Sequence, residues 1–196
     1  KTPLTMAVLG DGRTEQFYLK HLKELCSYNY AIRPLLFNSI NLKEATSLIK
    51  QAIKEERNPI FYFTDYDTIV NQNRVKAYEK FKKQFAKYPE VVIIDSMPSI
   101  EFWFLLHYCK TTREFRNAHE LTSVLKSHIP DYDKKIEYLE RIQWVQLLLE
   151  GNKMQDAISR SKEVLTQKED GNTGNHFPFT KMHMAIDAFD KQKINK

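Results

Sequence analysis

The sequence is poor in cysteine, in glycine and in long apolar segments, and each shortage narrows the possible protein classes. Only two cysteines occur, Cys26 and Cys109, and neither has a neighbour at metal-ligand spacing. They are typical of buried thiols in a reducing compartment. No apolar run approaches the length of a bilayer span, and the chain does not begin with a signal-peptide pattern. We therefore expect a cytoplasmic protein without a membrane partner.

Glycine is too sparse for the common phosphate-binding motifs. Gly10 and Gly12 follow the first apolar run and precede Arg13-Thr14. A phosphate-binding loop needs Lys and then Ser or Thr after its last glycine, and a dinucleotide fingerprint needs three spaced glycines. Both motifs are therefore excluded.

The composition of the 196-residue chain supports one substantial core, because 42% of its residues are hydrophobic and 12% are aromatic. We expect an α/β core over residues 1–110 and a helical extension packed on it over residues 111–196. With 30 Lys plus Arg against 25 Asp plus Glu, the net charge is +5. This mild excess is compatible with a polyanionic partner, and Arg13, Arg113 and Arg116 are candidates for nucleic-acid backbone contacts.

Apolar runs and amphipathic segments alternate in the first half of the chain. Strands are predicted at residues 4–9, 31–37, 61–65 and 91–95, with helices between them. This alternation predicts a parallel sheet of about four strands flanked by helices. After Ser99 only helices are predicted, at residues 100–108, 119–128, 134–149, 153–167 and 181–191.

Two acids, Asp65 and Asp67, end the apolar third strand. In an extended backbone, residues i and i+2 point to the same side, so both carboxylates are expected to aim at one point. Ligands of open α/β sheets bind outside the carboxyl ends of the strands, and paired carboxylates there suit Mg²⁺ or Mn²⁺. The alternative, favoured for an isolated Asp-x-Asp, is that Asp65 caps a loop and Asp67 starts a turn.

Other acids occupy equivalent places. Asp11 and Glu15 lie where the first strand turns into a helix, although Thr14 as a helix N-cap, with Glu15 acting on the helix dipole, is an alternative. Glu101 opens an apolar helix and therefore needs a partner. Clustered carboxylates raise one another's pKa unless a cation neutralises them, so a divalent metal is the simplest expectation.

These motifs resemble a known family. Acid-Gly-x-Thr-Glu after one strand and Asp-x-Asp after another resemble the Toprim domain of topoisomerases, bacterial primases and overcoming-lysogenization-defect nucleases. Residues 96–108, Ser-Met-Pro-Ser-Ile-Glu-Phe-Trp-Phe-Leu-Leu-His-Tyr, are similar to the Ser-Asn-Pro-x-(aromatic)-Glu-x-Trp-x-Leu-Leu-His signature of RloB-like proteins. Residues 132–134 and 178–183 resemble that family's Tyr-x-Lys and Asn-Pro-x-Thr-x-x-His motifs.

The resemblance implies a Toprim-like, Rossmann-like fold and a Mg²⁺- or Mn²⁺-dependent nuclease that hydrolyses phosphodiester bonds in DNA or RNA, linked to restriction or phage defence. It also implies an ATPase partner, and a homodimer is a further candidate assembly. Lys134 and His183 would hold the scissile phosphate or assist proton transfer. From the residues alone, Lys134 is a solvated lysine and His183 a helix-face residue. The metal ligands implied are Asp11, Glu15, Asp65, Asp67 and Glu101.

Some residues depart from the family pattern. Asp11 stands where Glu is usual, and Met97 and Phe177 each replace an Asn. The shorter acid keeps open a second hypothesis, a non-catalytic module of the same fold that binds nucleic acid or a protein. A third hypothesis is a phosphatase with Asp65 as nucleophile, although Ile69 stands where that motif has Thr or Val.

Overall fold

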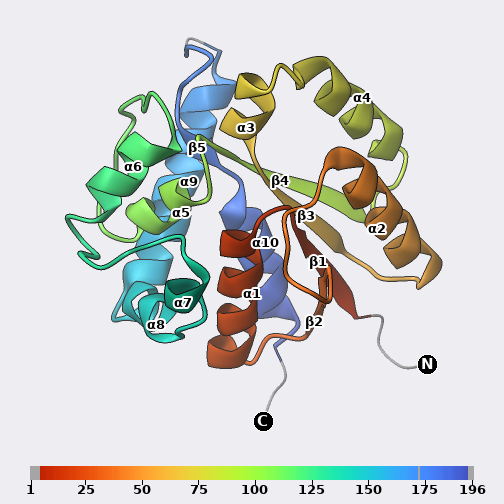
Figure 1. Cartoon of the computed structure of the whole chain (residues 1–196), viewed down its shortest axis with the longest axis horizontal. Coiled ribbons are helices and arrows are strands. Elements are labelled where there is room, and N and C mark those ends of the chain that lie inside the picture. Colours follow the sequence, from red (N-terminus) through yellow and green to blue (C-terminus); the bar gives the residue numbers. More distant parts are fainter. Residues whose placement is uncertain (1–4, 172, 194–196) are drawn as a thin grey trace.

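The computed structural model describes residues 5–171 and 173–193, and its centre is a twisted sheet with helices on both faces (Figure 1). The sheet has five strands: β1 (Met6–Gly10), β2 (Tyr30–Arg33), β3 (Ile60–Asp65), β4 (Val91–Met97) and β5 (Phe179–Thr180). Their order across the sheet is β2-β1-β3-β4-β5, and every neighbouring pair is parallel except β4 and β5.

The helices form two groups, one on each face of the sheet. None in the described part of the chain is long and apolar enough to cross a membrane. In chain order they are α1 (Arg13–Cys26), α2 (Leu42–Lys54), α3 (Tyr66–Asn71), α4 (Val75–Phe85), α5 (Glu101–Leu106), α6 (Ala118–Leu125), α7 (Ile136–Leu139), α8 (Gln143–Leu149), α9 (Lys153–Glu169) and α10 (Met182–Lys191).

Alternating side chains of the buried strands divide the interior into two cores. Met6 and Val8 of β1 pack with α1, α10 and the other C-terminal helices, whereas Ala7 and Leu9 pack with α2 and α4. A strand buried on both faces reads as a continuous apolar run, which is why β1, β3 and β4 are visible in the sequence. The predicted α/β architecture is confirmed.

The predicted ends of two strands need adjustment. The first strand begins at Met6, and Leu4 lies outside the described residues. Strand β2 ends at Arg33, directly before Pro34, and lies at the edge of the sheet. Proline cannot donate a ladder hydrogen bond, so it is compatible only with such a position.

The prediction of helices alone after Ser99 is wrong at β5. This strand has only two residues, Phe179 and Thr180, which pair antiparallel with Met97 and Ser96. The pairing extends β4 two residues beyond Asp95, its predicted end. A two-residue strand is too short to show a sequence period, so only the tertiary structure reveals it.

The predicted single helix over residues 134–149 is also wrong, because the structure has two short helices there, α7 and α8. The break follows from competition for the carbonyl oxygen of Leu139. Trp144 donates to it through Nε1 at 3.2 Å, and the Nε2 of His21 on α1 donates at 2.8 Å. This carbonyl would otherwise accept the i+4 backbone bond that continues a helix.

The larger core joins the sheet to the C-terminal helices. Trp103 on α5 is fully buried, and its Nε1 donates to the Tyr18 hydroxyl on α1 at 2.8 Å. Phe104 and Trp144 extend this aromatic cluster around Tyr18. The contact between α1 and α5 therefore depends on close aromatic packing and one buried hydrogen bond.

We predict that Trp103→Ala lowers the free energy of unfolding by about 3–5 kcal/mol, as large-to-small changes in cores do. Tyr18→Phe should cost about 1–3 kcal/mol, because it leaves the buried indole N–H without an acceptor. Urea denaturation measures both. Leu36→Ala is the control, since Leu36 is 84% exposed; its cost should stay within about 0.5 kcal/mol. An equally small cost for Trp103→Ala would contradict this packing.

Candidate functional site

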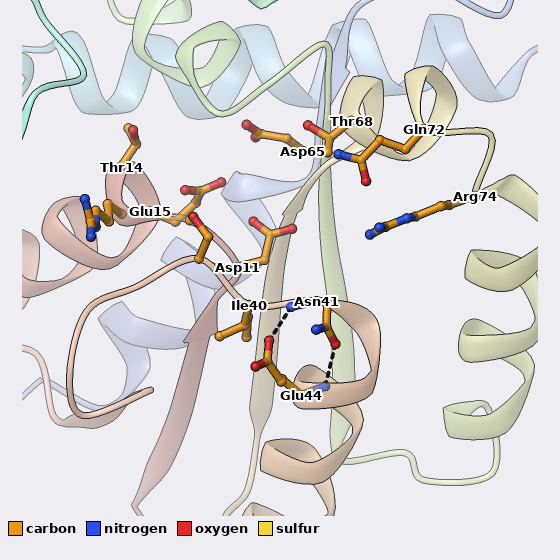
Figure 2. Close-up of a pocket in the computed structure, with 13 residues that line it drawn as sticks. Asp11, Thr14, Glu15, Ile40, Asn41, Glu44, Asp65, Thr68, Gln72 and Arg74 are labelled. Carbon is orange, nitrogen blue, oxygen red and sulfur yellow. Dashed lines mark hydrogen bonds between the residues drawn. The ribbon is translucent and has the colours of Figure 1, made fainter.

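The candidate site lies where the strand order changes direction. After β1 the chain adds β2 on one side and β3 on the other, and α1 and α2 cover opposite faces. Such a switch point leaves a crevice at the carboxyl ends of the two central strands. Asp11 follows β1 and Asp65 ends β3, and both line a cavity of about 570 Å³ there (Figure 2).

The main chain and side chain of Asp11 are both anchored. Its N–H donates to the Phe63 carbonyl of β3 at 3.2 Å, and its carbonyl accepts from the Ile40 N–H at 2.9 Å. Its Oδ2 accepts a hydrogen bond from the Thr64 hydroxyl. The carboxylate therefore has a fixed position on the cavity floor.

Glu15 lies in the first turn of α1 and is 3% exposed. Its carboxylate packs closely on Gly12: a Cβ there would lie 2.7 Å from Oε2, so a larger residue would displace this carboxylate. The Oε1 atom is buried and has no hydrogen-bond partner among the described residues. Gly12 is the N-cap of α1, so the alternative in which Thr14 is the N-cap is wrong.

Asp65 and Asp67 do not aim at one point, as an extended backbone would require. The chain enters α3 at Tyr66, which directs the two side chains apart. Asp65 Oδ1 accepts from the Ile100 N–H at 2.8 Å, at the start of α5. Asp67 Oδ2 instead accepts from the Ala118 N–H at 3.3 Å, and Asp67 does not line the 570 Å³ cavity.

Glu101 is fully buried at the start of α5 and has three partners, as expected for a charge in an apolar helix. It accepts hydrogen bonds from the Ser99 hydroxyl and, at 2.9 Å, from the Tyr132 hydroxyl. The Lys134 ammonium lies 2.8 Å from its Oε1. These contacts tie the C-terminal half of the chain to the carboxylates.

Four carboxyl groups thus come together from separate elements, and burial raises the pKa of Asp11, Glu15 and Asp65. Desolvation, with the neighbouring charge of Asp65, raises the pKa of Asp11 to about 7. Desolvation and Asp11 raise the pKa of Glu15 to about 8. The pKa of Asp65 is also raised well above its ordinary value by desolvation and by Glu15 and Glu101. Burial acts to lower the pKa of Lys134, but Glu101 and Asp65 raise it overall.

The structure does not bring His183 to these carboxylates. Its Nδ1 is hydrogen-bonded to the Ser161 hydroxyl on α9 at 2.6 Å. Burial lowers its pKa, and the charges that act on it are those of Lys162 and Asp187. The environment of His183 is therefore the α9–α10 contact.

The donor chemistry at the crevice fits a hard divalent cation, because all the groups are carboxylate oxygens and one buried oxygen of Glu15 lacks a partner. The side chains of the described residues nevertheless form no ready-made set of three metal ligands in this conformation. Lys134 supplies the positive charge next to Glu101 instead. Binding of a cation would therefore require the carboxylates of Asp11, Glu15 and Asp65 to close in on it.

A comparison with protein families identifies the chain. The family model described as RloB-like protein matches residues 6–189. The chain belongs to the RloB-like family. No curated protein and no solved structure matches it.

Sequence reasoning on this RloB-like chain overlooked four residues of the site. Ser99 and Tyr132 bind Glu101, and both lie in the motifs that resemble the family, so those motifs carried a signal for them. Thr64 and Arg74 had no such signal. Thr64 is one residue of an apolar strand and Arg74 follows a polar turn far from any motif, yet Thr64 donates to Asp11 and Arg74 lines the cavity.

The raised pKa of Glu15 predicts how stability changes with pH. The folded state keeps the proton up to about pH 8, whereas the unfolded chain loses it near 4.5, so stability falls as pH rises between these values. In metal-free buffer at pH 8.5, Glu15→Gln should be more stable than wild type by at least about 1 kcal/mol, or roughly 2–4 °C in Tm. At pH 4 this gain should vanish.

The same thermal measurement also reports the cation. Millimolar Mg²⁺ or Mn²⁺ at pH 8.5 should raise the Tm of wild type more than that of Glu15→Gln, because the cation neutralises the clustered charges. Glu24→Gln, an exposed acid on the same helix, is the matched control and should behave like wild type. A wild-type Tm insensitive to both pH and cation would contradict the electrostatic description of the site.

Proposed function

We propose that this RloB-like protein is a divalent-metal-dependent nuclease of the Toprim type, which hydrolyses phosphodiester bonds in DNA or RNA in a restriction-linked or anti-phage setting. The observation that carries the proposal is that Asp11, Glu15 and Asp65 line one cavity at the β1–β3 crevice, with Glu101 close enough for its charge to act on Glu15 and Asp65. One ammonium group, that of Lys134, faces these carboxyls. Buried acids in such excess favour a bound cation.

Asp11, Glu15 and Asp65 are the residues that would hold Mg²⁺ or Mn²⁺, since all three line the cavity. When bound, such an ion lowers the pKa of water and stabilises the charge of a phosphodiester under attack. Glu101 is fixed by three partners, so we assign it the role of positioning Lys134.

Lys134 is suited to binding a phosphate oxygen. Its neighbours raise its pKa, so it remains protonated at neutral pH and acts as a hydrogen-bond donor. Its side chain is 43% exposed, and its ammonium lies 2.8 Å from the buried Glu101. Of the two roles expected for Lys134, the structure therefore favours holding phosphate over accepting a proton.

A second candidate function is nucleic-acid binding without cleavage. The observation that favours it is the lack of a ready-made set of three metal ligands in the described residues. The phosphatase hypothesis gains no such support, because Asp67 is bound to the Ala118 N–H and does not join Asp65 at the cavity. The ATPase partner stays a prediction from the family resemblance, and the homodimer stays a prediction as well.

The proposal predicts that Asp65→Asn abolishes cleavage of plasmid, single-stranded DNA or tRNA in Mg²⁺ or Mn²⁺, with a loss of at least about 100-fold because a metal ligand is removed. Asp67→Asn should lose much less. Asp131→Asn, an exposed acid away from the cavity, is the control and should match wild type. Gel assays of cleavage measure all three.

The outcomes separate the two functions. Equal cleavage by wild type and Asp65→Asn would refute the site. Binding of nucleic acid by both proteins, with no cleavage by either in Mg²⁺ or Mn²⁺, would establish the non-catalytic module in place of the nuclease.

A further inference from the structure

Two arginines line the cavity above the carboxylates. Arg13 is the first residue of α1, and Arg74 precedes α4. Both border the same cavity as Asp11 and Asp65. Figure 2 shows Arg74 extending from the α3–α4 connection toward the cavity, on the side opposite Thr14 and Glu15 of α1. The cavity is therefore lined by two arginines as well as by carboxylates, and Arg74 lies on the side opposite Thr14 and Glu15.

The guanidinium group of neither arginine is paired with an acid in the part of the chain that the structure describes. Both arginines are exposed. By contrast, Arg113 pairs with Glu120, and the N–H of Arg116 donates to the same carboxylate. Neither Arg113 nor Arg116 lines the cavity, although the sequence had suggested both for backbone contacts. The guanidinium groups available at the site are those of Arg13 and Arg74.

A charge pattern of this kind fits a chain of phosphates better than one phosphate. Guanidinium groups bind phosphate oxygens through paired, charge-assisted hydrogen bonds. The floor of the cavity consists of carboxyl groups, which repel a phosphodiester when they are ionised and no cation neutralises them. A cavity of about 570 Å³ is of small-ligand size, so it can admit one stretch of a strand but not a whole duplex.

We propose that Arg13 and Arg74 hold the two phosphates that flank the cleaved phosphodiester, so that the substrate is a nucleic-acid strand continuing in both directions and the cut is internal. This inference rests on the proposed nuclease function. The arginines are positioning residues: they place the strand over the acidic floor and take no part in bond breaking.

The test measures cleavage of two substrates by wild type, by Arg13→Ala, by Arg74→Ala and by the double variant. One is a single-stranded oligonucleotide, and the other is bis(p-nitrophenyl) phosphate, a small diester without flanking phosphates. The ratio of kcat/KM for the oligonucleotide to that for the small diester should fall roughly 10-fold for each arginine removed, mainly through KM. Arg141→Ala, an exposed arginine away from the cavity, is the matched control and should keep the wild-type ratio.

Binding provides an independent measurement. The Kd for a fluorescent oligonucleotide should rise in each arginine variant, and the slope of log Kd against log salt should drop by roughly 0.7 per arginine, the value for one single-strand phosphate contact. Both residues are exposed, so their substitution should change stability by less than about 0.5 kcal/mol, which a Tm measurement verifies.

The outcomes distinguish this inference from the proposed function. If wild type cleaves but the double variant keeps the wild-type substrate ratio and salt slope, the arginine assignment is overturned and the nuclease stands. If wild type cleaves neither substrate but loses binding on removal of the arginines, the strand contacts stand and the nuclease fails.

Discussion

The repulsion between buried carboxylates is the constraint on which the rest of this structure depends. Asp11, Glu15 and Asp65 share one crevice, and each has a pKa raised by burial and by its neighbours. Such an arrangement costs folding free energy, so the surrounding structure must hold the groups in place. The backbone does so directly: Asp11 is tied to β3 and to Ile40, and Asp65 accepts from the Ile100 N–H. Because the fold keeps these carboxylates together at a cost in stability, we infer that the cluster serves a function.

The C-terminal half of the chain is part of the site as well as part of the core. Tyr132 and Lys134 reach the Glu101 carboxylate, and Ala118 binds Asp67. The larger hydrophobic core likewise runs from the sheet through α5 into α8, α9 and α10. The family match over residues 6–189 covers both halves of the chain, and the residues at the site run from Asp11 to Lys134. Division of the chain into a catalytic core and a dispensable extension would therefore leave Glu101 buried without its cation.

Features set by local patterns could be predicted from the sequence, and features set by distant contacts could not. Apolar runs located β1, β3 and β4, and the acids at their ends pointed to a shared crevice because parallel strands end at one edge. The break between α7 and α8 depends on His21, more than a hundred residues away, which occupies the Leu139 carbonyl. Strand β5 is defined only by its pairing with β4.

The residues of the candidate site likewise divide into those that local sequence patterns could predict and those that they could not. Asp11, Glu15, Asp65 and Glu101 each end a strand or open a helix, so their convergence follows from the topology. Asp67 was misplaced because one residue of helix, Tyr66, is enough to turn its side chain from the cavity toward α6. No local signal could report that turn.

The distribution of charge at the crevice matters more for polyanion binding than the net charge of +5. Coulombic attraction falls with distance and with screening, so two guanidinium groups at a cavity rim act on a phosphate more strongly than lysines spread over distant helices. The acidic floor has the opposite effect, because a phosphodiester placed there without a cation meets Asp11, Glu15 and Asp65. In the proposed nuclease, the arginines would attract the strand, and the floor would repel it where its carboxyls are ionised and no metal is bound.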